Sequence, residues 1–328
     1  MTTPLVLGVD GGNSKTEVWL VSADGSIIGT ARGTTSSHQQ IGLERGMAQL
    51  EALAREAASQ ASGVLAGEGV FCLAGADFPS DVRALTRAIE RLGIVERVTV
   101  LNDAFAGLRA GASRPWGIAL VCGRGINGAG IGPDGRQVRF DGVGDISGDW
   151  GGGRSVAYAG LAAAVRGRDG RGPRTALEAQ VPAFFGRRSP PALVKALYDQ
   201  PRLQARIEEL APLVFDAAIA GDRVARSIVD RLADELIAMA TALIRRLRLT
   251  RSDVEVVLTG GVFGATDAAF YERLDSGIRD VAPGARLVRL SVPPVAGAVL
   301  LALDRLGGDA AARSAAEARL RAAAIRTA

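Results

Sequence analysis

Residues 5–22 read LVLGVDGGNSKTEVWLVS, and this stretch decides the fold. It opens with a short apolar strand that ends in Asp10-Gly-Gly, and from Thr16 it alternates apolar and polar residues as a half-buried strand does. The turn signal Ala23-Asp24-Gly25 and a returning strand over 26–31 follow. The start of the chain therefore predicts three antiparallel strands, the first two joined by a glycine-rich turn.

The same pattern occurs twice along the chain. The first third continues with helical and strand patterns in the order β-β-β-α-β-α-β-α, and a second series begins after Pro115. Ser22-Ala-Asp-Gly25 in the first half corresponds to Gly132-Pro-Asp-Gly135 in the second. This internal repeat predicts an α/β protein with two similar domains facing a central cleft, and sheets of this kind bind ligands at the carboxyl ends of their strands.

The expected domain limits follow from the repeat. We expect a first domain over residues 1–115 and a second over 116–307, with a helical insertion near 167–220. The segment 308–328 is rich in Ala and Arg, and we expect a solvated helix there that completes the first domain. A chain of 328 residues has the length of about two domains.

Composition excludes several classes of protein. With 48% hydrophobic and 23% charged residues the chain is typical of a globular protein. No apolar run reaches the roughly 18–20 residues of a membrane span, and no secretory signal is visible, so we expect a cytoplasmic protein without a membrane partner. The pI is 9.6, but the arginines are scattered among acidic residues, so we expect no nucleic-acid partner.

Cysteine and histidine are too few for several kinds of site. The two cysteines, Cys72 and Cys122, cannot build a disulfide framework. Together with the single histidine, His38, they cannot supply the four ligands of a structural zinc ion. A Ser-His-Asp triad would need His38, and the sequence has no G-x-S-x-G elbow.

Two glycine turns at equivalent places in the repeat are candidate phosphate-binding loops. In Asp10-Gly-Gly-Asn-Ser-Lys-Thr16 a turn without bulky side chains lets backbone N–H groups approach phosphate oxygens, and Asp10 could hold Mg²⁺. Val121-Cys-Gly-Arg-Gly-Ile-Asn127 is the matching turn. Each alone is also compatible with a plain hairpin, but as a pair they predict a phosphate clamp from two walls.

Three further motifs complete the candidate site. Asp103 follows a strand, where it is either a general base for a substrate hydroxyl or a helix N-cap. Gly260-Gly261 ends another strand and would admit a flat ring such as adenine, or is a simple βα turn. Asp149 could accept hydrogen bonds from sugar hydroxyls beside Trp150, which offers a stacking face, or the two are an N-cap and a core residue.

In this order the motifs resemble those of the sugar kinase, actin and heat-shock-chaperone ATPase superfamily. From Leu5 to Leu306 the chain resembles the BadF/BadG/BcrA/BcrD ATPase family, and within it the N-acetylglucosamine kinase branch. The resemblance implies two ribonuclease-H-like, actin-like domains and assigns roles to residues. It implies Asp103 as the catalytic aspartate and ATP contacts from Gly11, Gly12, Asn13, Thr16, Gly123, Gly125, Asn127, Gly260 and Gly261. It implies sugar contacts from Ser37, His38, Asp103 and Asp149. To these we add, from their places beside the matched residues, Asp10 as a Mg²⁺ ligand, Lys15 and Arg124 as ATP contacts and Trp150 as a sugar contact.

The chain departs from the family pattern in the second glycine loop and in the sugar pocket. Arg124 and Ile126 replace the hydroxyl residues of a Gly-Thr-Gly-Ser loop, Ser37 replaces an Asn, and Trp150 replaces a Glu. Arg124 could contact a phosphate directly or point to solvent. The changes at Ser37 and Trp150 leave the choice of sugar open.

The implied reaction is ATP-dependent phosphorylation of an amino sugar, N-acetylglucosamine first, at its 6-hydroxyl, with ATP and Mg²⁺ as cofactors and a homodimer as a possible assembly. Glucosamine or N-acetylmuramic acid is an alternative substrate. A second alternative is a BadF-type ATPase activator without a sugar substrate, whose relatives hold an iron–sulfur cluster through cysteines at a dimer interface. A third is an actin-like nucleotide-dependent scaffold.

Overall fold

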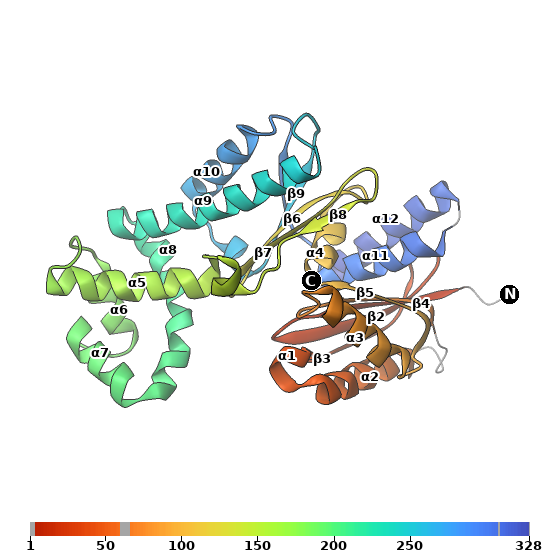
Figure 1. Ribbon diagram of the computed structural model, residues 1–328, viewed down its shortest axis with the longest axis horizontal. Coiled ribbons are helices and arrows are strands. Elements are labelled where there is room, and N and C mark those ends of the chain that lie inside the picture. Colours follow the sequence, from red (N-terminus) through yellow and green to blue (C-terminus); the bar gives the residue numbers. More distant parts are fainter. Residues whose placement is uncertain (1–3, 60–65, 308, 328) are drawn as a thin grey trace. The chain divides into compact units, whose positions relative to one another are not determined.

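The computed structural model describes residues 4–59, 66–307 and 309–327, which form two compact units (Figure 1). The first unit contains the chain up to residue 119 together with 129–141 and the segment from 288 onward. The second contains 120–128 and 142–287. Among the described helices, none combines the length and the hydropathy that a membrane-spanning segment needs.

A five-stranded mixed sheet forms the centre of the first unit. Its strands lie in the order β3-β2-β1-β4-β5: β1 (Leu5–Gly11), β2 (Lys15–Ser22), β3 (Ile27–Thr34), β4 (Ala66–Leu73) and β5 (Val95–Asn102). The first three pair antiparallel, whereas β4 and β5 continue the sheet in parallel with β1. Because β4 and β5 run parallel to β1, the carboxyl ends of all three meet at one edge.

Helices cover both faces of this sheet. They are α1 (His38–Ile41), α2 (Leu43–Ser59), α3 (Pro79–Glu90), α4 (Ala104–Gly111), α11 (Pro294–Leu306) and α12 (Ala310–Thr327). Side chains alternate along β1, so Leu7 and Val9 join the core under α2 and α3, while Val6 joins the core under α4, α11 and α12. The apolar residues of α2 recur at helical spacing on the buried face.

Close backbone contact fixes α4, the helix that follows Asp103. A Cβ at Gly297 in α11 would lie 1.9 Å from the carbonyl oxygen of Ala106, and one at Gly8 would lie 2.5 Å from the backbone nitrogen of Val299. Only glycine permits such approach of two backbones. The two glycines thus seat α11 directly on α4 and on β1.

The other sheet has the strand order β10-β9-β6-β7-β8, which repeats the order of the first sheet when read from the opposite end. Its strands are β6 (Gly117–Cys122), β7 (Ile126–Ile131), β8 (Gln137–Arg139), β9 (Glu255–Thr259) and β10 (Arg286–Arg289). The remaining helices are η1 (Gly144–Ser147), α5 (Gly152–Asp169), α6 (Leu177–Phe184), α7 (Pro190–Asp199), η2 (Pro201–Leu210), α8 (Ala211–Ile219), α9 (Arg223–Arg246), η3 (Gly261–Gly264) and α10 (Ala268–Arg279). The duplicated α/β fold expected from the sequence is therefore confirmed.

The last helix differs from the solvated helix that its composition predicted. In α12, Ala316, Leu320 and Ala324 are buried at a spacing of four residues and pack in the core beside α11. Alanine gives little contrast with its neighbours, so this buried stripe was invisible in the sequence. Residues 129–141 and 288–307 also cluster with the first unit, whereas the domain limits 1–115 and 116–307 stay a prediction.

Candidate active site

The glycine turn between β1 and β2 is narrow and well fixed. Thr16 pairs with Gly11 across the two strands, and the N–H of Gly12 donates to the carbonyl of Lys15 at 2.8 Å. The buried Thr16 hydroxyl donates to the Ser36 hydroxyl at 2.8 Å, which ties the turn to the segment before α1. Asn13, at the tip of the turn, is exposed. Of the residues expected to contact ATP, Gly11, Gly12, Asn13, Lys15 and Thr16 therefore lie together in this turn.

Acidic groups influence one another beside this turn. Burial raises the pKa of Asp10 to about 7, helped by the negative charges of Asp103 and Glu17. Burial likewise raises the pKa of Asp103 to about 6, and Asp77 contributes to this shift. Lys15 forms an ion pair with Glu17 at 2.8 Å. The first unit thus gathers carboxylates that are costly to keep charged in the absence of a cation.

Asp103 occupies the N-cap position of α4 but its side chain does not cap the helix. The N–H of Ala104 donates instead to the Asn102 side-chain oxygen at 3.2 Å, and the Asp103 carboxylate makes no capping hydrogen bond. The N-cap alternative considered for Asp103 therefore describes its position and not its side-chain contacts. A carboxylate left out of the cap is available to a substrate hydroxyl.

The two candidate sugar contacts at the start of α1, Ser37 and His38, carry unsatisfied polar atoms. Within the described part of the chain, Ser37 Oγ and His38 Nδ1 are buried and have no hydrogen-bond partner. Buried polar atoms are nearly always hydrogen-bonded, so these two atoms have hydrogen-bonding capacity left for a water or a ligand. A hydroxyl-rich ligand such as a sugar supplies donors and acceptors of the required kind.

Sequence reasoning missed Asp77, which lies just beyond β4. Its buried carboxylate accepts hydrogen bonds from Gln39 Nε2 at 3.0 Å and from Asn102 Nδ2 at 3.1 Å. Burial raises its pKa. The same rule that selected Asp103, a polar residue at the carboxyl end of a parallel strand, would have selected Asp77 as well.

In the second unit, the turn Gly123–Gly125 joins β6 to β7 and is tied to the start of α5. The N–H of Gly153 donates to the Gly123 carbonyl at 2.8 Å, and that of Arg154 donates to the Arg124 carbonyl at 3.0 Å. Asn127, near the start of β7, accepts a hydrogen bond from the N–H of Gly128 at 2.7 Å. Backbone hydrogen bonds thus tie this turn to the start of α5.

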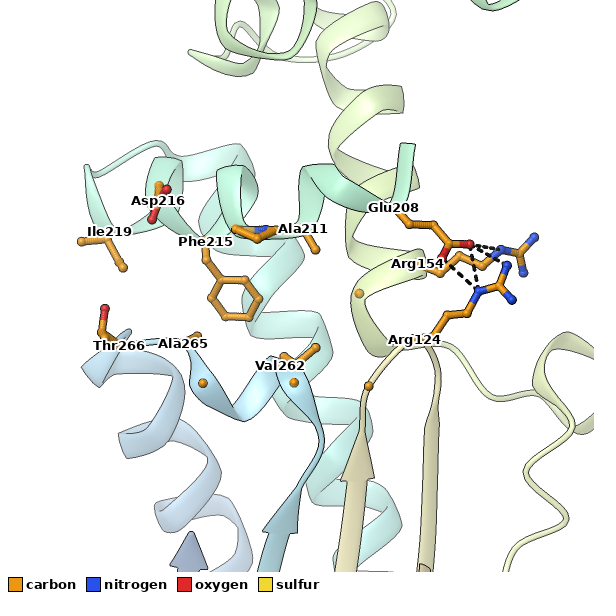
Figure 2. A pocket seen from close by; sticks show the side chains of 15 residues that line it. Arg124, Arg154, Glu208, Ala211, Phe215, Asp216, Ile219, Val262, Ala265 and Thr266 are labelled. Carbon is orange, nitrogen blue, oxygen red and sulfur yellow. Dashed lines mark hydrogen bonds and ion pairs between the residues drawn. The ribbon is translucent and has the colours of Figure 1, made fainter. Parts of the chain in front are cut away.

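A cavity of about 610 Å³ lies next to this turn, within the second unit (Figure 2). Its walls come from the turn, the start of α5, η2, α8 and η3, and include Phe215, Ile219 and Val262. Gly261 lies in its wall, and no Cβ contact closes the space in front of this residue. An apolar slot with polar groups at its edge has the character of a site for a flat heteroaromatic ring.

Arg124 lies at the edge of this cavity and is already paired. Its Nε donates to the two carboxylate oxygens of Glu208 at 3.0 and 2.9 Å, and its Nη2 donates to Oε1 at 2.8 Å (Figure 2). Arg154 approaches the same carboxylate at 3.8 Å. The Arg124 side chain is 69% exposed, so solvent screens its attraction to Glu208.

Asp149 and Trp150 lie in the loop between η1 and α5. The Ser147 hydroxyl donates to the Asp149 carboxylate, and the guanidinium of Arg231 lies 4.0 Å from the centre of the Trp150 ring. One face of the indole is therefore covered by Arg231. These two candidate sugar contacts belong to the second unit, whereas Ser37, His38 and Asp103 belong to the first.

Gly260 allows a sharp test of the cavity wall. Its φ of 109° and ψ of 158° are accessible to glycine alone, and a Cβ would lie 2.4 Å from the Cys122 carbonyl oxygen. We expect Gly260→Ala to lower the free energy of unfolding by at least about 1–3 kcal/mol and to weaken ATP binding. Urea denaturation and calorimetry measure the two effects. Gly67→Ala in β4, whose Cβ would meet only Glu96 Oε2 at 3.8 Å and which lies outside the cavity, is the control, and equal behaviour of the two variants would contradict the assigned strain.

The donor set fits a magnesium ion that arrives with a nucleotide. Among the described residues, no three His, Cys, Asp or Glu side chains form a cluster that could hold a metal alone. Mg²⁺ is commonly bound by one or two carboxylates together with substrate phosphates and water, and Asp10 supplies a carboxylate beside the phosphate-loop candidate. Burial, with the charges of Asp103 and Glu17, raises the pKa of Asp10, and a divalent cation would stabilise its charged form.

Two sheets of matching strand order, each with a glycine turn between its first two strands, define the class of actin-like ATPases, to which many sugar kinases belong. The chain belongs to the BadF/BadG/BcrA/BcrD ATPase family, whose model matches residues 7–302. ATP is accordingly its nucleotide.

Two similar proteins and one similar solved structure are named as kinases of amino sugars. An N-acetylmuramic acid/N-acetylglucosamine kinase of Clostridium acetobutylicum is 27% identical over 299 residues, covering 90% of this chain and 97% of the relative. An N-acetyl-D-glucosamine kinase of Dictyostelium discoideum is 25% identical over 318 residues, covering 93% and 99%. The solved structure of a candidate N-acetylglucosamine kinase from Chromobacterium violaceum superposes with a TM-score of 0.69 at 25% identity, covering 91% and 99%.

Proposed function

We propose that this protein is an ATP-dependent kinase that phosphorylates N-acetylglucosamine on its 6-hydroxyl group. The observation that carries the proposal is the arrangement in the first unit: a carboxylate that does not cap its helix, Asp103, and unpartnered polar atoms on Ser37 and His38. Family membership and the two named relatives support ATP and an amino sugar as substrates.

In the proposed reaction, Asp103 orients the 6-hydroxyl of the sugar and accepts its proton. The hydroxyl oxygen attacks the γ-phosphorus of ATP while the bond from this phosphorus to the β-γ bridging oxygen breaks, giving the sugar 6-phosphate and ADP. Magnesium bound with ATP neutralises phosphate charge, and Asp10 is the residue that would hold it. Backbone groups of Gly11, Gly12, Gly123 and Gly125, with the side chains of Asn13, Lys15, Thr16, Arg124 and Asn127, would stabilise the phosphates.

In this proposal the second unit would bind the adenosine and the first unit would bind the sugar. The cavity beside Gly261 would take the adenosine, since its apolar walls fit an aromatic ring. Ser37 and His38 would contact sugar hydroxyls, and Asp149 and Trp150 stay candidates for the same role. Cys72 and Cys122 are fully buried in β4 and β6, which argues against the ATPase-activator alternative, because cluster ligands must reach a shared surface.

An assay of ADP release across N-acetylglucosamine, glucosamine, N-acetylmuramic acid, N-acetylmannosamine and glucose tests the proposal. We expect the highest kcat/KM for N-acetylglucosamine and little ADP release without sugar. A higher value for another amino sugar would reassign the substrate within the class. ADP release that ignores every sugar would contradict kinase activity and favour the scaffold or activator alternatives.

A further inference from the structure

Asp77 joins two segments that each carry a proposed site residue. Its Oδ2 accepts from Gln39 Nε2 at 3.0 Å, and its Oδ1 accepts from Asn102 Nδ2 at 3.1 Å. Gln39 follows His38 in the chain, and Asn102 precedes Asp103. We propose that Asp77 is a positioning residue that fixes the sugar-contact turn relative to the strand end that carries Asp103. This inference rests on the proposed function.

The two hydrogen bonds of Asp77 form a bridge between Gln39 and Asn102, and the geometry of this bridge is defined at both ends. Asn102 accepts a hydrogen bond from the N–H of Ala104 through Oδ1, so its amide orientation is set and Nδ2 must face Asp77. At the other end, α1 rests on the turn after β4. A Cβ at Gly75, where φ is 86°, would lie 2.7 Å from His38 Cε1 and 3.0 Å from Gln39 Cδ. The end of β4, the start of α1 and the end of β5 thus pack as one group.

Burial makes the bridge stronger than a surface contact. Asp77 is 7% exposed, and charge-assisted hydrogen bonds are about twice as strong as neutral ones. Both of its carboxylate oxygens accept from side chains whose chain neighbours are proposed to touch the sugar. A shift of about 1 Å between such groups can cost about 10²-fold in rate, so a bridge of this kind controls activity without contacting the substrate.

The first test is Asp77→Asn. The new amide keeps one acceptor for Asn102 Nδ2 and presents its NH₂ group to Gln39, so the Gln39 bond is lost unless the exposed Gln39 amide turns over, and neither bond is any longer charge-assisted. We expect kcat/KM for N-acetylglucosamine to fall about 10–100-fold, through both a higher sugar KM and a lower kcat, while the ATP KM changes less than about twofold. Gln39→Ala, which removes one donor at an exposed side chain, tests the same bridge if Asp77→Asn fails to fold, with a smaller sugar-specific loss expected.

A polarity swap separates positioning from a general loss of structure. In Asp77→Asn combined with Gln39→Glu, the amide NH₂ of residue 77 can donate to the new carboxylate, so the bridge re-forms with reversed polarity and unchanged net charge. We expect this double variant to recover at least about fivefold in sugar kcat/KM over Asp77→Asn alone. Gln40→Glu in the same background is the matched control, because it adds the same charge to α1 at an exposed residue for which no contact with Asp77 exists, and it should recover nothing.

The outcomes separate the two proposals. A wild-type protein that phosphorylates no sugar would contradict the proposed function. An active wild type with an Asp77→Asn kcat/KM within twofold of its own would overturn the role of Asp77 alone. Equal recovery by Gln39→Glu and Gln40→Glu, or none by Gln39→Glu in a folded double variant, would also overturn it.

Discussion

Asp103→Asn is expected to lower kcat about 10²–10⁴-fold while ATP binding stays nearly unchanged. The amide keeps the size of the carboxylate but cannot accept the proton of the sugar hydroxyl. Asp103 makes no capping hydrogen bond to α4, so the substitution removes no helix cap. Steady-state kinetics with N-acetylglucosamine and calorimetric titration with ATP measure the two quantities. Asp199→Asn, which changes an exposed carboxylate on α7, is the control and should leave both unchanged.

The raised pKa of Asp103 makes this test sharper. Since burial raises the pKa to about 6, the active carboxylate form is lost as the pH falls through that value, and the sugar kcat/KM of the wild type should fall with it. Residual activity of Asp103→Asn should lack this fall. A raised carboxyl pKa also means that the charged form costs stability above about pH 6, so the variant should melt no lower than wild type at pH 8. Near-normal turnover would remove Asp103 from its assigned role.

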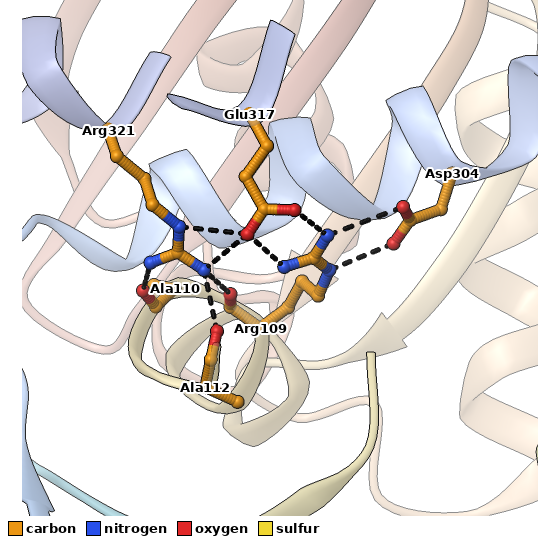
Figure 3. A network of polar contacts seen from close by, with 6 residues as sticks. All are labelled: Arg109, Ala110, Ala112, Asp304, Glu317 and Arg321. Carbon is orange, nitrogen blue, oxygen red and sulfur yellow. Dashed lines mark hydrogen bonds and ion pairs between the residues drawn. The ribbon is translucent and has the colours of Figure 1, made fainter. Parts of the chain in front are cut away.

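Glu317→Ala is expected to cause the largest loss of stability, about 3–5 kcal/mol, because it leaves a buried arginine short of a partner. Arg109 is 4% exposed and donates to Glu317 at 2.9 and 2.6 Å, and to Asp304 at 2.9 Å (Figure 3). Glu317 also accepts from Arg321 at 2.9 Å. Arg321 in turn donates to the carbonyls of Arg109, Ala110 and Ala112, the free backbone acceptors at the end of α4.

Urea denaturation measures this loss. Glu51→Ala, which breaks an exposed pair with Arg55 four residues away, is the control and should cost less than about 0.5 kcal/mol. Although burial alone would raise the pKa of Glu317, its hydrogen bonds from Arg109 and Arg321 lower it below the ordinary 4.5. Its contribution is therefore present above about pH 4.5 and is lost as the pH falls through the lowered pKa. If Glu317→Ala lowers the free energy of unfolding by less than about 1 kcal/mol at pH 7, water replaces Glu317 as the partner of the Arg109 guanidinium, and the expected cost of an unpaired buried charge is contradicted.

The sequence was sufficient for features that depend on local patterns. Three local patterns predicted the strands, their order along the chain and the repeat: the alternation from Thr16 onward, the glycine turns and the two Asp-Gly hairpin signals. Each of these patterns lies within a few neighbouring residues. Asp10 and Asp103 were found by their place at strand ends. Their roles, like those of the glycine turns, stay proposals.

Features that depend on distant contacts were out of reach. The pair of Arg109 and Glu317 joins residues 208 positions apart, and that of Arg124 and Glu208 joins residues 84 apart. The hydropathy pattern of a sequence contains no information about which distant residue will pair with a given arginine. The buried stripe of α12 was hidden for another reason, since its small alanines hardly differ in hydropathy from their neighbours. Asp77 belongs with Asp10 and Asp103 by its place after a parallel strand, but it lies four residues beyond the end of β4, whereas Asp103 follows β5 directly.

Transfer of the γ-phosphoryl group from ATP to the sugar is tested most directly by a phosphorus–proton correlation spectrum of a reaction with ATP, Mg²⁺ and N-acetylglucosamine. We predict a new phosphomonoester signal coupled to the two protons on carbon 6, growing in step with ADP. ADP accompanied only by inorganic phosphate, or no consumption of ATP at all, would contradict the account.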